Sequence, residues 1–337
     1  MQKWFEWQWQ HRGLAQIILL PLSWLFQLLA IIRRYAYQQN WLKSYALPVP
    51  VIVVGNITVG GTGKTPLVVL LAEQLKNAGY TPGIISRGYG GTQVGDVLAN
   101  SLPSLFGDEP VLIAKRTACP VWVNADRVMA GQSLLSAHPN CNVIISDDGL
   151  QHYRLKRDIE IVVLNSKHSF GNQRLLPAGP LREKMSRLTQ VLAIVDTGYM
   201  GLKNVEGRDF LTPIYSMSLL MQGIYSLDEA RKISLSELLH QPVVAIAGIG
   251  HPDRFFSFIK GLGLNCEYLA FNDHHAFTQQ DFADLQHKTI LMTEKDAVKC
   301  KHLELNNAWY LPVSAMLANT EQQTTLIDLI IQQLNKR

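Results

Sequence analysis

A glycine-rich segment between two hydrophobic stretches constrains the fold of this chain more than any other feature. Residues 49–56 (VPVIVVGN) form a β-branched run that predicts a buried strand, and residues 58–65 (TVGGTGKT) follow it directly. Leucines then recur at helical spacing over residues 65–78, before Gly79. Backbone N–H groups of small residues at a helix N-terminus surround phosphate oxygens well. The order strand, glycine loop, helix therefore predicts a nucleotide-phosphate site.

The residues of this loop are the candidate nucleotide-binding residues: Thr58, Val59, Gly60, Gly61, Thr62, Gly63, Lys64 and Thr65. Lys64 is expected to reach the β- and γ-phosphates of ATP, and the Thr65 hydroxyl to ligate Mg²⁺. The strict P-loop pattern has glycine where Thr58 stands. A glycine turn followed by an incidental Lys-Thr pair is therefore the alternative, and the flanking strand and helix count against it.

Two carboxylates follow another apolar run. Asp147 and Asp148 come directly after residues 142–146 (NVIIS). In P-loop enzymes an acid at the carboxyl end of a strand binds Mg²⁺ directly or through water. Acids also cap strands in many other proteins, so the pair gains its meaning from the phosphate loop earlier in the chain. We expect both carboxylates at a Mg²⁺ site.

The chain is long enough for more than one domain, since 337 residues exceed the usual size of one hydrophobic core. Apolar runs that alternate with helix-like stretches predict a doubly wound parallel α/β sheet over residues 41–200. Residues 201–240 are more polar and are expected to form a linker or a small β excursion. Apolar runs beginning at residue 242 predict a second, smaller α/β domain over residues 241–337.

The N-terminal region, residues 1–40, has the pattern of a membrane anchor. Residues 14–32 carry no charged side chain and would span about 28 Å as a helix. Tryptophans gather around this run: Trp4, Trp7, Trp9, Trp24 and Trp41. Arg33, Arg34 and Lys43 follow it, which places the remainder of the chain in the cytoplasm. A buried core helix is one alternative. A cleaved signal peptide is another, although no small-x-small site follows the run.

Charge and cysteine content exclude several other classes. Charged residues make up 17% of the chain and the net charge is +4, which fits neither a disordered chain nor a basic nucleic-acid-binding tail. No basic stripe with interleaved aromatic residues and no zinc motif occurs, so we expect no nucleic-acid partner. The 4 cysteines are widely spaced, which is typical of reduced thiols. Nothing in the sequence indicates an obligate protein partner.

Several motifs together resemble the tetraacyldisaccharide 4′-kinase family of lipid A biosynthesis. They occur in order along the chain: GNITVGGTGKTP (55–66), ISRGYGG (85–91), GDEP (107–110), DDGLQH (147–152), LLPAGPLRE (175–183), FNDHHAFT (271–278) and TEKDAVK (293–299). Thr58 fits the phosphate loop of this family, whereas Leu150 stands where the family more often has Phe. The motifs cover the chain from about residue 50 to residue 300.

The resemblance implies an ATP-dependent lipid kinase of the inner (cytoplasmic) membrane, with one N-terminal anchor and a catalytic body facing the cytoplasm. The γ-phosphate of ATP would pass to the 4′-hydroxyl of a tetraacyldisaccharide 1-phosphate, giving lipid IVA. The acylated disaccharide 1-phosphate and the membrane lipids are the implied partners. A phosphate loop that is tethered to a membrane fits this reaction, because the acceptor cannot leave the bilayer.

The resemblance also assigns roles to individual residues. Asp108 is the candidate base, and the family pairs it with a histidine that corresponds here to His274 rather than to His275. Without the resemblance, Asp108 would be interpreted as a turn or cap acid and the histidines as exposed loop residues. Glu183 matches a motif position that would join Asp147, Asp148 and Thr65 around Mg²⁺. Its alternative is an ion pair with a neighbouring basic residue.

Weaker candidates for contact with the substrate are Arg87, Gln151, His152 and Arg182. An acceptor that carries a phosphate needs at least one cationic partner, and a guanidinium group matches phosphate oxygens in its geometry.

Two other functions remain open at this point. A P-loop ATPase of the partitioning or nitrogenase-iron-protein type carries a similar loop, but with a second lysine where this chain has Val59. A nucleotide-regulated membrane adaptor would need neither Asp108 nor His274.

Overall fold

The computed structural model describes residues 9, 14–167, 170–198, 211–318 and 324–336. Its internal contacts group these residues into two compact units. Unit 1 comprises the described residues within 1–87, 124–218 and 317–337, and unit 2 those within 88–123 and 219–316. The chain therefore passes between the units four times. Each unit is described by itself.

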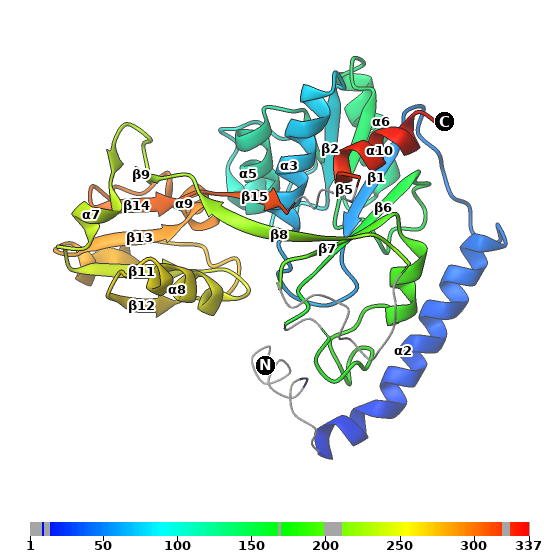
Figure 1. Ribbon diagram of the computed structural model, residues 1–337, viewed down its shortest axis with the longest axis horizontal. Helices are drawn as coiled ribbons and strands as arrows, with labels where there is room; N and C mark the ends of the chain where they lie inside the picture. The colour runs from blue at the N-terminus through cyan, green and yellow to red at the C-terminus, as the bar shows by residue number, and fades with distance from the viewer. Residues whose placement is uncertain (1–8, 10–13, 168–169, 199–210, 319–323, 337) are drawn as a thin grey trace. The chain divides into compact units, whose positions relative to one another are not determined.

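Unit 1 is built on parallel strands in the order β8-β7-β6-β1-β5-β2. Their bounds are β1 Val51–Gly55, β2 Pro82–Ser86, β5 Val143–Asp147, β6 Ile159–Leu164, β7 Ala193–Asp196 and β8 Ile214–Met221. Every residue of β1, β2, β5 and β7 is buried, because these strands are apolar on both faces. The predicted parallel α/β sheet is confirmed (Figure 1).

The strand order changes direction at β1. The chain continues from β1 to β2 on one side of the sheet and later returns to β6, β7 and β8 on the other side. In open α/β sheets, ligands bind beyond the carboxyl ends of the strands at such a switch point. The glycine loop follows β1, and Asp147 at the end of the neighbouring β5 pairs in register with Val54. The topology thus brings two of the predicted site elements to one edge.

The described part of unit 1 contains four α-helices. They are α2 Leu14–Gln38, α3 Lys64–Asn77, α6 Arg127–Ala137 and α10 Leu326–Leu334, with a 3₁₀ segment η1 at Met185–Gln190. The Asp126 side chain accepts hydrogen bonds from two backbone amides at the start of α6, which explains where that helix begins. α3 and α6 pack on strands of the sheet, and α10 packs on α3.

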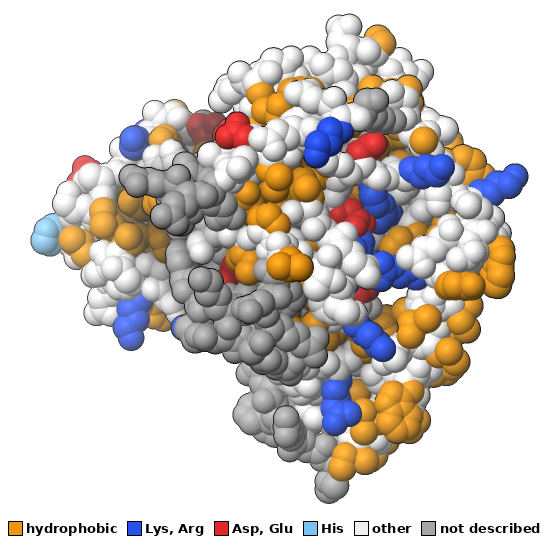
Figure 2. Space-filling model, turned by 45° about the vertical axis from the view of Figure 1, so that its right-hand side comes forward, with side chains coloured by type: hydrophobic (Ala, Val, Ile, Leu, Met, Phe, Trp, Pro, Cys, Tyr) orange, Lys and Arg blue, Asp and Glu red, His pale blue; other side chains and the backbone are white. Residues whose placement is uncertain are grey.

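The N-terminal helix α2 is longer than the predicted 14–32 and includes Arg33 and Arg34. Its small polar face is buried: Gln16 is 5% exposed and Ser23 4%. The Ser23 hydroxyl donates a hydrogen bond to the Leu175 carbonyl at 2.8 Å. The opposite face carries exposed apolar side chains, which Figure 2 shows gathered along the lower right of that view. Among the described residues, α2 is the one helix long and apolar enough to cross a membrane.

Unit 2 contains a mixed sheet in the order β10-β9-β14-β13-β11-β12. The strands are β9 Ile224–Ser226, β10 Lys232–Ile233, β11 Val243–Ala247, β12 Cys266–Ala270, β13 Thr289–Thr293 and β14 Ala308–Leu311. The four strands from β11 to β14 pair in parallel, whereas β9 and β10 join in antiparallel fashion. β3 Gly95–Asp96 pairs with β4 Val121–Val123, and β15 spans Val313–Leu317.

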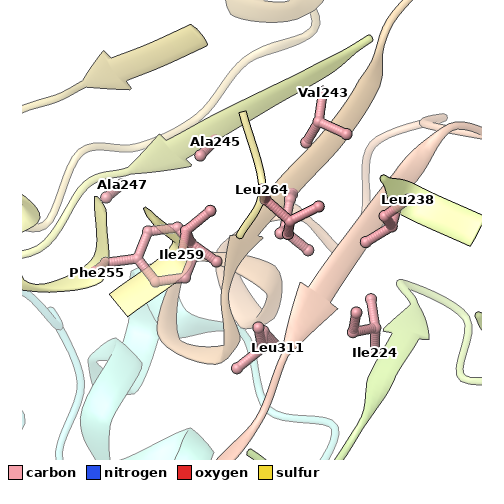
Figure 3. Packing of buried hydrophobic residues seen from close by; sticks show 10 residues of the cluster. Ile224, Leu238, Val243, Ala245, Ala247, Phe255, Ile259, Leu264 and Leu311 are labelled. Atoms are coloured by element: carbon pink, nitrogen blue, oxygen red, sulfur yellow. The ribbon is translucent and has the colours of Figure 1, made fainter. Parts of the chain in front are cut away.

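The remaining helices belong to unit 2: α4 Pro103–Phe106, α5 Asp108–Thr117, α7 Leu235–Leu238, α8 Pro252–Gly261, the 3₁₀ segment η3 Gln279–Leu285, and α9 Glu294–Cys300. One core cluster joins α8 to the sheet through Phe255, Ile259 and Leu311 (Figure 3). Full burial of such side chains contributes about 1.5–3 kcal/mol each. A second cluster on Phe277 and Phe282 supports the loop that precedes η3.

The grouping of contacts differs from the expected domain boundaries in more than one segment: the described residues within 317–337, expected in the second domain, group with unit 1. The sequence places Asp108 within a continuous domain of residues 41–200, but residues 88–123 group with unit 2. α5 packs against α9, so its buried face is completed by residues almost 200 positions later in the chain. Sequence periodicity reports which face of a helix is buried and not which partner covers it. Residues 201–240, expected to form a linker or a small β excursion, contain β8, β9 and β10 in their described part, and residues 199–210 lie outside it.

Candidate active site

The glycine loop of unit 1 turns into α3 at Gly63. Gly63 has φ 90°, in the left-handed region where glycine is favoured, and Lys64 is the first residue of α3. A Cβ added at Gly63 would meet Thr197 Cγ2 and Met217 Cε at 3.4 Å. The loop also receives support from Thr197, whose hydroxyl donates to the Thr62 carbonyl at 3.3 Å. Glycine at 63 therefore satisfies a backbone requirement of the turn.

The LLPAGPLRE motif forms a strap that fixes the start of the loop. The Val59 amide donates to the Pro180 carbonyl at 2.9 Å, and the Arg182 amide donates to the Ile57 carbonyl at 2.7 Å. Thr58 and Leu181 form a β-bridge between these two bonds. The strap thus holds residues 57–59 by backbone bonds on both sides of Thr58, which is consistent with a non-glycine residue at that position.

Lys64, Asp148 and Arg182 form one charged group. Lys64 Nζ lies 3.5 Å from Asp148 Oδ1, and Arg182 Nη1 lies 3.3 Å from Asp148 Oδ2. Burial would raise the pKa of Asp148, but the charges of Lys64 and Arg182 outweigh it and lower that pKa. Asp148 also has φ 47°, a sparsely populated conformation of the kind found at functional sites. Two cations, including the loop lysine, thus meet an ionised carboxylate here.

Asp147 is buried, with 1% exposure, and is the last residue of β5, immediately before Asp148 in the sequence. The Ser86 hydroxyl is 3.5 Å from Asp147 Oδ2. Arg127, which the sequence did not single out, donates to the carbonyls of Asp147 at 3.3 Å and Asn124 at 2.8 Å. Arg127 is 2% exposed, and burial lowers its pKa to about 10. In the sequence, Arg127 is a single basic residue at the end of residues 124–127 (NADR). Single arginines are usually exposed to solvent, so this one gave no indication of a role.

Glu183 lies in a different environment from the one expected. Its Oε1 accepts a hydrogen bond from Gln151 Nε2 at 2.7 Å, and its Oε2 accepts one from the Tyr153 hydroxyl at 2.8 Å. Arg187 Nε is 3.3 Å from Oε2. Burial and the neighbouring Glu183 raise the pKa of Tyr153 to about 12, so its proton stays in place. Both carboxylate oxygens are engaged, so Glu183 anchors Gln151 and Tyr153, and its expected place around Mg²⁺ stays a prediction.

The expected substrate contacts divide into anchored and open positions. Gln151 also donates to the Asn56 carbonyl at 3.1 Å, so it ties the loop after β1 to Glu183. His152 is half-buried, and burial together with the charges of Arg127 and Arg87 lowers its pKa to about 4. At neutral pH it is an uncharged imidazole. Arg87 is exposed at the end of β2 and remains available for an anion.

Unit 2 contains the second cluster, which is built around Asp108. Asp108 is the first residue of α5 and is 4% exposed. Gly107 precedes it with φ 91°, and a Cβ there would lie 2.7 Å from the Tyr89 carbonyl oxygen. Only glycine therefore allows the chain to enter α5 so close to the ISRGYGG segment.

Asp108 and His274 form a dyad. Nδ1 of His274 lies 3.0 Å from Asp108 Oδ2 and 3.1 Å from Oδ1. The Tyr89 ring packs against the imidazole with a centroid distance of 4.8 Å. The hydrogen bond to Asp108 raises the pKa of His274. Burial would raise the pKa of Asp108, but the hydrogen bond from His274 and the charge of Lys295 outweigh it, and that pKa is lowered.

The neighbouring histidine has a different role. His275 Nε2 lies 3.2 Å from Asp281 Oδ2, and its ring packs against Phe271 and Phe277. It therefore holds the loop onto η3 and does not contact Asp108. The two histidines thus have different partners in the structure. From the sequence, they were distinguished only by their positions in the family motif.

The donor set in unit 1 fits Mg²⁺. The Thr65 hydroxyl and the carboxylates of Asp147 and Asp148 are hard oxygen donors, and Mg²⁺ takes one or two protein carboxylates together with phosphate oxygens and water. The described residues hold no group of three or more His, Cys, Asp or Glu that would form an all-protein metal cage. This arrangement suits an ion that arrives with a nucleotide.

The different environments of Asp147 and Glu183 lead to a prediction. For Glu183→Gln we expect the Mg²⁺ concentration at half-maximal rate to stay within about twofold, while kcat falls about tenfold because the Gln151 and Tyr153 anchor is disturbed. For Asp147→Asn we expect that Mg²⁺ concentration to rise more than about tenfold. Mg²⁺ titrations of the steady-state rate measure both. Glu73→Gln, on the exposed face of α3, is the control. An equal loss of Mg²⁺ affinity in both variants would return Glu183 to the metal site.

Comparisons with known proteins identify the family of this chain. A family model described as Tetraacyldisaccharide-1-P 4′-kinase matches residues 15–332. A tetraacyldisaccharide 4′-kinase of Methylobacillus flagellatus is 48% identical over 93% of this chain and 92% of its own length. The enzyme of Dechloromonas aromatica is 44% identical over 100% and 99%. A crystal structure of LpxK from Aquifex aeolicus in complex with ATP is similar, with a TM-score of 0.77 and 32% identity over 95% of this chain and 100% of that one. The chain belongs to the tetraacyldisaccharide 4′-kinase family.

Proposed function

We propose that this protein transfers the γ-phosphate of ATP to the 4′-hydroxyl of a tetraacyldisaccharide 1-phosphate, forming lipid IVA. The observation that carries the proposal is the combination of a phosphate loop with an Asp108–His274 dyad in a member of this kinase family. An ATPase of the partitioning type or a membrane adaptor has no use for a carboxylate–imidazole pair of this kind. In a kinase, such a pair can take the proton from the acceptor hydroxyl.

The dyad supplies the base. Asp108 accepts the hydrogen bond from Nδ1–H of His274, which leaves Nε2 to take a proton. As the 4′-oxygen attacks the γ-phosphorus, its proton passes to Nε2. The bond from the γ-phosphorus to the β,γ-bridging oxygen breaks, and ADP leaves. The buried Asp108 carboxylate then stabilises the imidazolium that forms.

The residues of unit 1 bind and orient the nucleotide. The backbone amides of residues 60–65 face the phosphates, and Lys64 neutralises charge that develops on the β- and γ-oxygens. Thr65, Asp147 and Asp148 would hold Mg²⁺, which supplies further charge neutralisation when bound. Arg182, Arg87 and the uncharged His152 are the proposed contacts for the anionic acceptor. Because the dyad belongs to unit 2, both units are needed for the reaction.

The direct test is an acceptor-dependent transfer assay. Full-length protein in detergent is incubated with Mg²⁺, γ-labelled ATP and an acylated glucosamine disaccharide 1-phosphate. We expect label in the lipid product and little label released as free phosphate when the acceptor is omitted. Hydrolysis of ATP at the same rate with and without the acceptor would instead support the ATPase alternative.

We further propose that α2 attaches the protein to the cytoplasmic face of the inner membrane through its exposed apolar face. Ile18 is 77% exposed, Leu25 51% and Leu29 58%, and their spacing places them on one side of the helix. Exposed apolar area of this extent along one helix is typical of lipid contact. The acceptor is itself a lipid, so attachment keeps the enzyme close to its substrate.

This proposal predicts the result of a flotation experiment. Ile18→Ser, Leu25→Ser and Leu29→Ser together should reduce binding to anionic phospholipid vesicles by more than about tenfold, since each apolar side chain contributes about 1.5–3 kcal/mol when buried. Leu98→Ser with Leu102→Ser removes similarly exposed side chains from unit 2 and should leave flotation unchanged. Equal flotation of the triple variant and the unaltered protein would contradict the assignment of α2.

A further inference from the structure

Lys295 makes the densest set of ionic contacts near the dyad. It lies in the first turn of α9, and its Nζ is 3.7 Å from Asp108 Oδ2, 3.1 Å from Glu109 Oε1 and 3.8 Å from Asp273 Oδ1. Its side chain is 17% exposed. Three carboxylates, two from α5 and one from the loop that carries His274, therefore converge on one ammonium group of unit 2.

The position of Lys295 is fixed by the residue that follows it. Asp296 is fully buried and accepts hydrogen bonds from the Gly248 amide at 3.1 Å and the Thr293 hydroxyl at 2.6 Å. Lys299 Nζ lies 2.7 Å from Asp296 Oδ1 and donates to the Gly248 carbonyl at 3.0 Å. These bonds tie the start of α9 to the end of β11, so Lys295 projects from a rigid helix and not from a loop.

The charged groups around the dyad and Lys295 come from three elements. α5 contributes Asp108 and Glu109, the loop before η3 contributes Asp273, and α9 contributes Lys295 and Lys299. The Tyr89 ring also packs against the imidazole. Without Lys295, three carboxylates would share this region with Lys299 as the remaining cation of α9 close to Asp108.

We propose that Lys295 is a positioning residue for the dyad, which holds the Asp108 carboxylate toward His274 and offsets the negative charge around the imidazole. The inference rests on the proposed role of Asp108 and His274 as the base. Lys295 does not need to touch ATP or the acceptor for this purpose, since it acts through the carboxylate it contacts.

The positive charge of Lys295 acts on the pKa of His274. Burial would lower the pKa of Lys295, but Glu109, Asp108 and Asp273 outweigh it and raise that pKa, so the ammonium persists throughout the neutral range. The hydrogen bond to Asp108 raises the pKa of His274, and the positive charge of Lys295 opposes this rise. Removal of Lys295 therefore lets the pKa of His274 rise further. More of the imidazole is then protonated at neutral pH, when it is unable to accept a proton.

Two measurements on full-length protein in detergent test the proposal. The first is the pH dependence of kcat for Lys295→Met, Lys295→Arg and the unaltered enzyme. The second is an NMR titration of His274 in ¹⁵N-histidine-labelled protein, with its signals assigned by their loss in His274→Gln. Lys288→Met is the matched control, because Lys288 pairs with Glu267 on the exposed surface of the same unit.

For Lys295→Met we expect the His274 titration and the acidic limb of the kcat profile to move upward together by about one pH unit. At pH values below this limb, kcat of Lys295→Met should then be about tenfold lower than that of the unaltered enzyme, and it should recover at alkaline pH. Lys295→Arg keeps the charge and should restore most of the profile. An unchanged His274 titration, or a loss of kcat that is equal at every pH, would overturn the proposal.

Failure of the proposal is distinguishable from failure of the proposed base. If Asp108→Asn keeps full turnover, the dyad is not the base, whatever Lys295 does. If Asp108→Asn is inactive while Lys295→Met shows neither shift, the dyad role stands and the role of Lys295 is refuted.

Discussion

Asp108→Asn is expected to lower kcat for phosphoryl transfer by about 10³-fold, while the KM for ATP stays within about twofold. The amide keeps the size of the side chain but removes the charge that stabilises the imidazolium. It can also present its NH₂ group to Nδ1, which favours the tautomer in which Nε2 carries the proton. Because Asp108 is 4% exposed, water cannot replace the carboxylate.

Steady-state kinetics with acceptor and ATP varied separately measure this effect. His274→Gln should cost a similar factor, and the double variant little more than either single one, because the two side chains act as a unit. Asp253→Asn, an exposed acid in the first turn of α8, serves as the control and should keep full activity. Additive losses in the double variant would show that the two residues act separately.

Lys64→Met is expected to lower kcat/KM for ATP by about 10³-fold. Lys64 is the first residue of α3 and is 13% exposed, so its charge acts in a partly dehydrated setting at a helix N-terminus. Its loss removes the cation proposed to contact the β- and γ-phosphates. Arg182 remains next to Asp148, and the acid therefore keeps one counter-charge.

Calorimetric titration with a non-hydrolysable ATP analogue separates binding from chemistry for this variant. We expect weaker binding and slower turnover together, because the lysine contacts the nucleotide before and during transfer. Lys76→Met, an exposed lysine in the last turn of the same helix, should match the unaltered protein. Normal nucleotide binding and turnover in Lys64→Met would mean that the loop binds something other than a nucleotide.

The sequence predicted the parts of the fold that depend on local pattern. The strand β1, the loop through Thr65 and the start of α3 follow from one β-branched run, three glycines and the leucine spacing after them. Asp147 was expected at the end of a strand, and the sheet order then brings β5 beside β1 in register. Neighbouring residues in the sequence determine these features, so they can be predicted from it.

Other parts of the site depend on long-range packing. Arg127 carries no distinguishing local pattern, and Lys295 lies in the TEKDAVK motif without a role assigned to it from sequence. The importance of both comes from the carboxylates and carbonyls that the fold brings to them. The change in the interpretation of Glu183 has the same origin, because Gln151 and Tyr153 are 32 and 30 positions away in sequence. The pairing of Asp108 with His274 spans 166 positions and was expected only through the resemblance to a family.

The N-terminal helix illustrates an intermediate case. Its apolar length was clear from the sequence, but the small polar residues Gln16 and Ser23 gave little indication that they form the buried face. The hydrogen bond from Ser23 to Leu175 explains it, since the partner is a backbone carbonyl of the strap. Such a partner has no signature in side-chain composition.

The position of the new phosphate in the product shows whether the enzyme phosphorylates the 4′-hydroxyl. The product of an incubation with ATP, Mg²⁺ and the acylated disaccharide 1-phosphate is purified and examined by ³¹P–¹H correlation NMR. For transfer to the 4′-hydroxyl we expect two phosphomonoesters, the original one at C1 and a new one coupled to the proton at C4′. A pyrophosphate at C1, or consumption of ATP with the lipid unchanged, would contradict it.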